Sequence, residues 1–187
     1  SGAVGAVPER VPPSIGDPAL VTGSLMVTSM ADIFQNFLQN GKIQIGFLGG
    51  AQVDKHGNIN TTAVGPYNTP KVRLPGSGGA CEIAQHAQRV LIVTKLDKRA
   101  FPDKVDFITS NGKRVKKVIT NMGILEPDAT GEMTLTALYP GVTFEAVQEN
   151  IGWALKKAAH LSEVSLPTLK EIDLLRTKLD PKRQHIK

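Results

Sequence analysis

Two glycine-rich turns, each next to an apolar segment, constrain the fold of this chain more than any other feature. The first, GGAQ at residues 49–52, follows an apolar run at 43–48 that predicts a buried strand. The second, GSGGA at 76–80, leads into a helix predicted at about residues 79–87. Glycine lets a backbone amide approach a ligand closely, and free amides at a helix start favour negative charge. The two turns therefore indicate a binding site built from main chain.

The rest of the pattern is that of an α/β protein. The run VLIVT at residues 90–94 is typical of a parallel strand that is covered on both faces. Strands are also predicted at residues 107–109, 115–120 and 133–138. We therefore expect an α/β sandwich with a mostly parallel central sheet, in which segments 43–48 and 90–94 are both buried.

Capping residues mark three further helices. Ser29 precedes one helix with Asp32 in its first turn, and Thr143 precedes a second that runs to about residue 150. Thr168 and Glu171 form a capping box for the last helix, which the Asp-Pro pair at 180–181 ends. The apolar faces of the first and last helices are Met30, Ile33, Phe34, Phe37 and Leu38, and Leu169, Ile172, Leu175 and Leu179. Since no repeat or linker interrupts the pattern, we expect one domain over residues 1–187.

Composition limits the partners and the compartment. Aromatic residues make up only 5% of the 187 residues, so the core must be mainly aliphatic. A single cysteine excludes an internal disulfide and a cysteine-rich zinc site. We find neither a membrane-spanning apolar run nor a signal peptide, and we expect a cytoplasmic protein. The net charge of +5 fits an anionic partner, although a solvated lysine surface explains it equally simply. The densest basic cluster, KRVKK at 113–117, lacks interleaved aromatics, which disfavours nucleic acid.

Other catalytic patterns fail on spacing. Ser77 suggests a nucleophile elbow, but Pro75 occupies the position where that motif needs glycine. Cys81 is either a reactive thiol at a helix start or, more simply, a small apolar residue. No P-loop or dinucleotide fingerprint follows either glycine run. The histidines lack metal-ligand spacing, and we expect no metal; they are His56, His86, His160 and His185.

Two segments carry a resemblance to a known family. The sequence GFLGGAQVDKHGNINTT at 46–62, followed by VRLPGSGGACEIA at 72–84, resembles the β subunit of family I CoA-transferases of the glutaconate and 3-oxoadipate type. The similarity extends to four further segments, at residues 14–18, 104–110, 120–125 and 179–181. It therefore covers nearly the whole chain, and the two glycine turns at this spacing are its most specific part.

The resemblance implies a fold, a partner and a reaction. It implies a three-layer α/β sandwich of the CoA-transferase type and an active site where an α subunit meets the β subunit, within a hetero-oligomer. A glutamate carboxylate of the β subunit attacks an acyl-CoA, forming a mixed anhydride and then an enzyme–CoA thioester. A carboxylic acid takes the CoA by the reverse steps. The substrates would thus be acyl-CoA and a mono- or dicarboxylic acid.

The resemblance also implies which residues bind the reacting acyl group. Backbone donors for the developing oxyanion would come from the second turn, with Gly78 and Gly79 as the foremost amides. Gln52 is the side chain expected to orient the glutamate or the acyl group, whereas Asp54 and Asn58 are expected to stabilise their turn. The full set of expected oxyanion and substrate residues is Gly78, Gly79, Ala80, Ser77, Gln52, Gly49 and Gly50.

The expected nucleophile is not within the sequence. In the family the glutamate stands directly before a Ser-Gly pair, and here Ser1-Gly2 opens the chain. We therefore expect no catalytic residue in these 187 residues, a glutamate immediately before Ser1, and absence of the family's N-terminal strands. Two alternatives remain open: a CoA-thioester hydrolase or decarboxylase on the same fold, which would not use the glutamate, and a non-catalytic assembly module. The two ligand-sized glycine turns argue against the module.

Overall fold

The computed structural model describes residues 2–14 and 16–183, which group into two compact units. The first unit comprises the described parts of segments 1–37 and 166–187, and the second is Leu38–Ser165. Within the described residues, we find no helix with the length and apolar character needed to span a bilayer.

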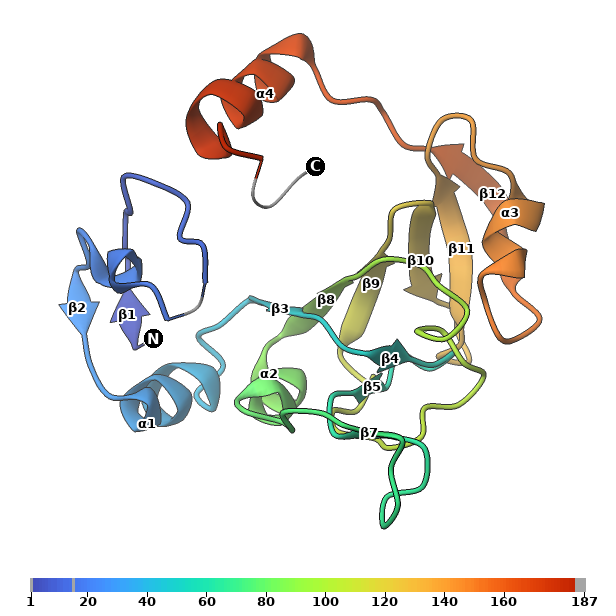
Figure 1. Cartoon of the computed structure of the whole chain (residues 1–187), viewed down its shortest axis with the longest axis horizontal. Helices are drawn as coiled ribbons and strands as arrows, with labels where there is room; N and C mark the ends of the chain where they lie inside the picture. The colour runs from blue at the N-terminus through green and yellow to red at the C-terminus, as the bar shows by residue number, and fades with distance from the viewer. Residues whose placement is uncertain (1, 15, 184–187) are drawn as a thin grey trace. The chain divides into compact units, whose positions relative to one another are not determined.

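The second unit is built on a six-stranded sheet (Figure 1). Its strand order is β12-β11-β10-β9-β8-β3. The β3–β8, β8–β9 and β11–β12 pairs are parallel, whereas β9–β10 and β10–β11 are antiparallel. The strands are β3 (Ile45–Leu48), β8 (Arg89–Val93), β9 (Val115–Ile119), β10 (Gly123–Pro127), β11 (Met133–Leu138) and β12 (Lys156–Glu163). The predicted α/β fold with a mostly parallel sheet is confirmed.

Helix α2 (Ala80–His86) connects β3 to β8 as the predicted crossover. Gly79 is its N-cap and Ala87 its C-cap, which confirms the helix predicted from the second glycine turn. The helix lies close to the sheet because β3 carries a glycine beneath it. A Cβ at Gly46 would overlap the Cγ2 of Ile83 and approach the Cβ of Ala87 to 3.3 Å.

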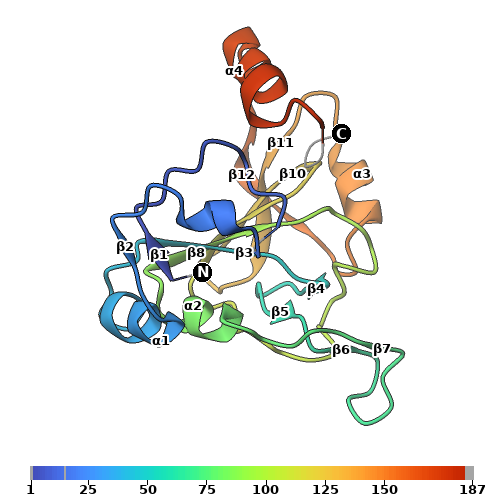
Figure 2. The ribbon, with the colours of Figure 1, turned by 60° about the vertical axis from the view of Figure 1, so that its left-hand side comes forward.

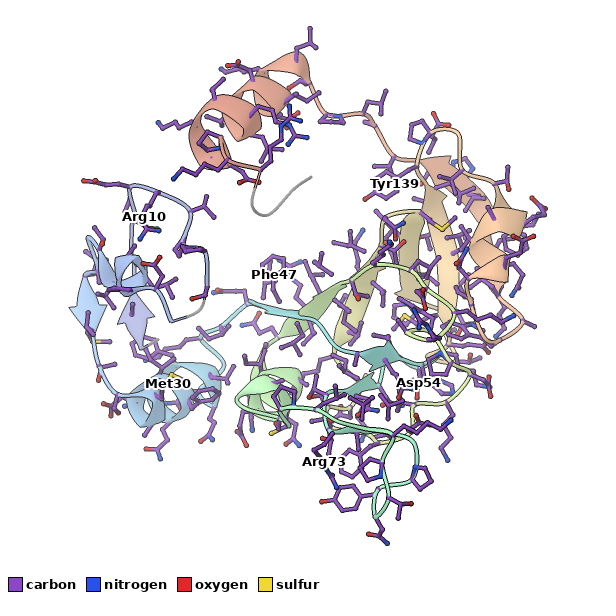
Figure 3. All side chains as sticks on the ribbon, in the orientation of Figure 1. Arg10, Met30, Phe47, Asp54, Arg73 and Tyr139 are labelled. Carbon is purple, nitrogen blue, oxygen red and sulfur yellow. The ribbon has the colours of Figure 1, made fainter. Side chains whose placement is uncertain are left out.

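The prediction that segments 43–48 and 90–94 are fully buried is wrong. Side chains alternate between the two faces of a strand. In β3, Gly46 is buried against α2, whereas Phe47 is 66% exposed and extends away from that helix (Figure 3). In β8, Val90 and Ile92 are buried, but Val93 is 54% exposed. A continuous apolar run therefore marked these strands correctly but did not reveal which faces are covered.

The core of the second unit is mainly aliphatic, as the composition predicts. It contains one pair of aromatic rings, Phe101 and Trp153, with centroids 6.4 Å apart. The largest fully buried side chains in the described residues are Phe101, Ile59, Ile92, Leu125, Met133, Leu135, Val53, Val90, Val115, Val118, Val147 and Asn60.

Two short antiparallel ladders lie in the chain between β3 and α2. Strand β4 (Gln52–Val53) pairs with β5 (Ile59–Asn60), and β6 (Ala63–Val64) pairs with β7 (Val72–Arg73). The loop that joins β6 to β7 projects from the unit (Figure 2). The strand predicted at residues 107–109 is absent from this region, where a single bridge joins Ser110 to Ile59. The three apolar or β-branched residues were too short a signal.

The remaining sheet elements divide into confirmed and missed predictions. Strands β9 and β11 confirm the predictions at residues 115–120 and 133–138, and α3 (Phe144–Glu149) begins after Thr143 as expected. Strands β10 and β12 were missed. Because β12 is mostly exposed and rich in lysine and glutamate, it has no apolar alternation to mark it.

The first unit contains the small elements at both ends of the described chain. These are β1 (Ala3–Val4), η1 (Pro18–Val21), β2 (Met26–Val27), α1 (Met30–Asp32) with most of η2 (Ile33–Leu38), α4 (Leu169–Leu174) and η3 (Leu175–Leu179). The Ser29 cap and the capping box of Thr168 and Glu171 are both present. The predicted apolar faces are not covered, since α1, α4 and η3 have no buried residue and Leu169 is 86% exposed. Periodicity identifies an apolar face, but not a partner that covers it.

The turn between β10 and β11 gives a pH-dependent prediction. Asp128 accepts hydrogen bonds from the N–H of Thr130 at 2.8 Å and from Lys156 Nζ at 3.0 Å. The Thr130 hydroxyl, followed by Lys156, holds the pKa of Asp128 well below its ordinary value. Because the folded-state pKa is lowered, the stabilisation is complete above the unfolded-state pKa and is lost as the pH falls below it. Asp128→Asn should therefore lower the melting temperature at pH 7 and reduce its decline toward pH 3. A variant whose melting curve parallels wild type at every pH would contradict this assignment.

Candidate functional site

Both glycine-rich turns are anchored beside the short strand β5. The N–H of Ala51 donates to the carbonyl oxygen of Asn60 at 3.0 Å, and the N–H of Gly76 donates to that of Thr61 at 2.8 Å. Asn60 and Thr61 are consecutive, so the two turns lie side by side although the β6–β7 hairpin separates them in the sequence. The structure thus brings together the two motifs that the sequence singled out.

The second turn presents two unused backbone donors. Gly76 and Gly78 have positive φ angles of 93° and 50°, which favour glycine. Ser77 satisfies the next donors: its carbonyl accepts from Ala80 at 2.9 Å, and its hydroxyl accepts from the N–H of Cys81 at 3.3 Å. Neither the N–H of Gly78 nor that of Gly79 donates to any group in the described part of the chain. Gly78 is exposed and Gly79 half-buried, so both donors are available to a ligand.

In the first turn the two glycines have different surroundings. A Cβ at Gly50 would overlap the Cγ2 of Ile59, so glycine there is explained by packing against β5. Gly49 is exposed, and a Cβ would meet the carbonyl oxygen of Val93 at an ordinary 3.5 Å. Neither glycine has a positive φ. This turn therefore supports the site through close packing rather than through an unusual backbone conformation.

Gln52 lies in a buried polar network. Its side-chain oxygen accepts from Asn60 Nδ2 at 2.6 Å and from the N–H of Asp106 at 3.1 Å. Its Nε2 donates to Asp106 Oδ2 at 2.9 Å, and the residue is only 6% exposed. The two lone pairs of the amide oxygen are thus occupied, which leaves one amide hydrogen for any further contact. Gln52 is fixed in place, and its immediate effect is to hold β4, β5 and the segment at Asp106 together.

Asp54 and Asn58 stabilise the β4–β5 turn as predicted. Asp54 Oδ1 accepts from the N–H groups of His56 and Asn58, both at 3.0 Å, and its Oδ2 accepts from Asn58 Nδ2 at 3.0 Å. Asn58 Oδ1 in turn accepts from the N–H of Gly112 at 3.0 Å. The Asp54 carboxylate is buried and fully engaged with its own turn (Figure 3), which explains its position without a catalytic role.

A hollow of about 440 Å³ adjoins the first glycine turn. It lies where β8 ends and continues along the loop after that strand. The lining residues are Ala51, Gln52, Val64, Thr94, Lys95, Asp97, Arg99 and Ala100. Two cations, one carboxylate and several small apolar groups therefore surround one space beside a sequence-predicted site residue.

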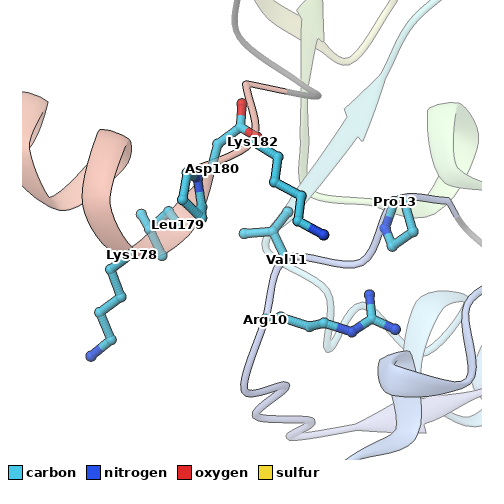
Figure 4. Close-up of a pocket in the computed structure, with 8 residues that line it drawn as sticks. Arg10, Val11, Pro13, Lys178, Leu179, Asp180 and Lys182 are labelled. Atoms are coloured by element: carbon cyan, nitrogen blue, oxygen red, sulfur yellow. The ribbon is translucent and has the colours of Figure 1, made fainter.

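A separate hollow of about 350 Å³ lies within the first unit, between a loop at Arg10–Pro13 and the chain end after η3 (Figure 4). The Lys182 side chain extends toward Val11 there. Arg10 is paired with Asp17 through contacts of 2.8 and 3.0 Å. This hollow contains none of the residues that the sequence predicted for the site. Ser1, beside which the nucleophile is expected, and Ile15 lie outside the described residues.

The comparison with known families decides the identity. Residues 3–150 match the family model of coenzyme A transferase. The chain belongs to the coenzyme A transferase family. Over 94% of its length it is 47% identical to the B subunit of 3-oxoadipate CoA-transferase of Pseudomonas knackmussii, of which it covers 74%. The predicted resemblance to the β subunits of this family is confirmed.

Solved structures agree with this assignment. Glutaconate coenzyme A-transferase from Acidaminococcus fermentans has a TM-score of 0.90 at 32% identity, covering all of this chain and 79% of that one. The decarboxylase AibA/AibB has a TM-score of 0.88 at 26% identity, covering 97% and 75%. The CoA-transferase fold is therefore shown, and it is shared by at least one protein with another activity.

Several residues of this CoA-transferase chain that shape the site escaped sequence reasoning. Asn60 links the first turn to Gln52, and its Oδ1 accepts from the N–H of Thr62 at 2.9 Å. Such an Asx turn is a recognisable signal in the segment Asn60-Thr61-Thr62. Asp106 and Thr109 join the network from a distant segment, and Thr109 Oγ1 accepts from the N–H of Thr61 at 2.9 Å. Nothing local in the sequence indicates those long-range contacts.

The other titratable candidates show ordinary environments. Cys81 is half-buried in the first turn of α2, and His86 lies on the same helix with its Nε2 3.5 Å from Glu82 Oε2. His56 Nδ1 lies 3.4 Å from the carbonyl oxygen of Gly131. Within the described residues, no three His, Cys, Asp or Glu side chains are grouped as metal ligands.

Proposed function

We propose that this chain is the β-subunit part of a CoA-transferase that moves CoA between an acyl-CoA and a mono- or dicarboxylic acid through a glutamyl–CoA thioester. The observation that carries the proposal is the pair of free amides at Gly78 and Gly79, in a chain 47% identical to the B subunit of a CoA-transferase. The nucleophile would be a glutamate encoded immediately before Ser1. The mechanism needs CoA thioesters as substrates, and we propose that it uses no metal.

The chemistry requires two exchanges at one carboxylate. The glutamate oxygen attacks the thioester carbonyl, and the CoA thiolate leaves to give an acyl–glutamyl anhydride. The thiolate then attacks the glutamyl carbonyl and releases the first acid, which leaves CoA on the enzyme. An incoming carboxylate reverses both steps and departs as the new acyl-CoA. Each step passes through a tetrahedral oxyanion, for which fixed backbone N–H groups are effective donors.

The site residues divide by their role in this scheme. The N–H groups of Gly78 and Gly79 are the proposed oxyanion donors. Ser77 and Ala80 shape the turn, since Ser77 already accepts from the N–H groups that follow. Gly49 and Gly50 place the first turn beside the second. Gln52 acts as a positioning residue through Asp106, with one amide hydrogen left for the acyl group.

We propose that an α subunit completes the site. The two CoA-transferase relatives of known name are the B halves of their enzymes, and this chain supplies one set of glycine turns. The assembly would be a cytoplasmic hetero-oligomer in which segment 1–187 belongs to a single β-type domain. Light scattering of the co-expressed subunits should give a mass that contains both chains. A lone β chain with full activity would contradict this proposal.

A decarboxylase is the second candidate function. The observation that favours it is the close similarity in fold to the decarboxylase AibA/AibB. The discriminating feature is the residue encoded before Ser1, because a transferase of this type needs a carboxylate there. An uncharged residue at that position would favour the decarboxylase or a thioester hydrolase.

The covalent intermediate provides the direct test. The complete enzyme, incubated with an acyl-CoA and then with borohydride, should lose activity because hydride reduces the glutamyl thioester to an alcohol. Borohydride without acyl-CoA serves as the control and should leave the enzyme active. Mass spectrometry of the treated chain should locate the reduced glutamate directly before Ser1. Full resistance to borohydride after acyl-CoA would exclude the thioester.

A further inference from the structure

We propose that the 440 Å³ hollow beside the first glycine turn binds a negatively charged group of a substrate, with Lys95 and Arg99 as its ligands. The group is either the second carboxylate of the acid or a phosphate of CoA, since both are anions that lysine and arginine bind. This inference rests on the proposed function and assigns a subsite to it.

The hollow lies at the edge of the sheet where ligands are expected. Ala51 and Gln52 follow the carboxyl end of β3, and Thr94 and Lys95 follow that of β8. Because β3 and β8 are parallel, their carboxyl ends share one edge of the sheet. Open α/β sheets bind ligands outside this edge. The crossover helix α2 starts from the same edge, which places the Gly79 turn and the hollow on one side of the sheet.

The charges around the hollow favour an anion. Lys95 and the Nη groups of Arg99 form no hydrogen bond or ion pair with any residue that the structure describes. Asp97 opposes an anion, but its Oδ1 is engaged by the N–H of Arg99 at 2.9 Å and by Arg99 Nε at 3.3 Å. The backbone N–H and then the guanidinium of Arg99 lower the pKa of Asp97. Two cations and one internally bonded carboxylate leave a net positive charge at the hollow.

The walls of the hollow are held in place before any ligand arrives. The N–H of Leu96 donates to Asn121 Oδ1 at 2.8 Å, and the N–H of Thr94 donates to the carbonyl of Ile119 at 3.1 Å. On the opposite side, the N–H of Val53 donates to the carbonyl of Ala100 at 2.8 Å. The loop that carries Lys95 and Arg99 is thus fastened to both β4 and the β9–β10 turn. A preformed site loses less conformational entropy on binding.

The remaining lining suits a short chain with a charged end. Ala51, Val64 and Ala100 provide small apolar surfaces, and Gln52 provides a buried polar group whose orientation is fixed. A substrate could therefore lie along the apolar surfaces while its anionic group reaches the cations. The basic cluster at 113–117 does not line this hollow.

The test uses the complete enzyme with its α subunit and three variants. These are Lys95→Gln, Arg99→Gln and, as a matched control, Lys98→Gln, which removes an exposed cation from the same loop without touching the hollow. One arm compares the KM of glutarate with that of butyrate, which lacks the second carboxylate. The other arm compares glutaryl-CoA with glutaryl-pantetheine, which lacks the phosphates. Calorimetric titration with glutarate and with CoA measures binding independently of turnover.

A selective change in one arm supports the subsite and names its ligand. Loss of a hydrogen bond to a charged group predicts a KM about tenfold higher. A rise for glutarate alone assigns the carboxylate, and a rise for glutaryl-CoA but not for the pantetheine ester assigns the phosphate. Unchanged KM and binding in both arms, or an equal effect of Lys98→Gln, would overturn the proposal. If borohydride finds no thioester, calorimetry still decides the subsite, so the two failures can be told apart.

Discussion

Replacing Gly79 by valine should reduce the turnover of the complete enzyme by about a hundredfold or more. Loss of a single oxyanion donor typically has an effect on this order. The N–H of Gly79 makes no contact with any described group, and a branched side chain beside it would block the approach of the acyl oxygen. The backbone at Gly79 has φ −88° and ψ 2°, a conformation open to other residues, so the fold should survive. The decisive measurement is turnover together with the melting temperature of the same variant.

Gly131→Ala is the matched control for this substitution. Gly131 also lies in an open turn, with a positive φ of 84° and no atom within 4 Å of an added Cβ. It belongs to the β10–β11 turn and lines neither glycine motif. Its replacement should cost about 1 kcal/mol of stability through backbone strain and leave turnover unchanged. Wild-type turnover in Gly79→Val would remove this glycine from the mechanism and leave it as a packing residue.

Gly112→Ala should destabilise the protein by about 3 kcal/mol or more. A Cβ there would overlap the carbonyl oxygen of His56 and lie 2.6 Å from the carbonyl carbon of Gly57. It would also lie 2.9 Å from the backbone nitrogen of Asn58. All three atoms are main chain of the β4–β5 turn and cannot rotate away. The melting temperature of the complete enzyme should fall by roughly 10 °C.

The control for Gly112 is a glycine with room for a side chain. Gly49→Ala adds a Cβ 3.5 Å from the nearest atom, at an ordinary φ, and should change stability by less than about 1 kcal/mol. Thermal or urea unfolding of both variants under one set of conditions compares them directly. Equal stability of the two variants would show that the β4–β5 turn moves freely away from Gly112.

Local signals in the sequence determined the elements that flank the site. The caps at Ser29, Thr143 and Thr168 are present because a side-chain oxygen and an N–H three residues on suffice to form them. Helix α2 and strand β8 follow from their own residues for the same reason. The family resemblance rests on the motifs themselves, and the comparisons confirm it.

Only the tertiary structure decided what these elements meet. The two glycine turns converge because Asn60 and Thr61 accept from both, and Gln52 is held by Asp106, which is distant in the sequence. Covered and exposed faces were also decided at this level, as Phe47 shows. A helix cap or a turn depends on neighbours within a few residues, whereas burial and long-range hydrogen bonds depend on which strand pairs with which. Sequence therefore determined the local conformation of the site, and strand pairing determined its assembly.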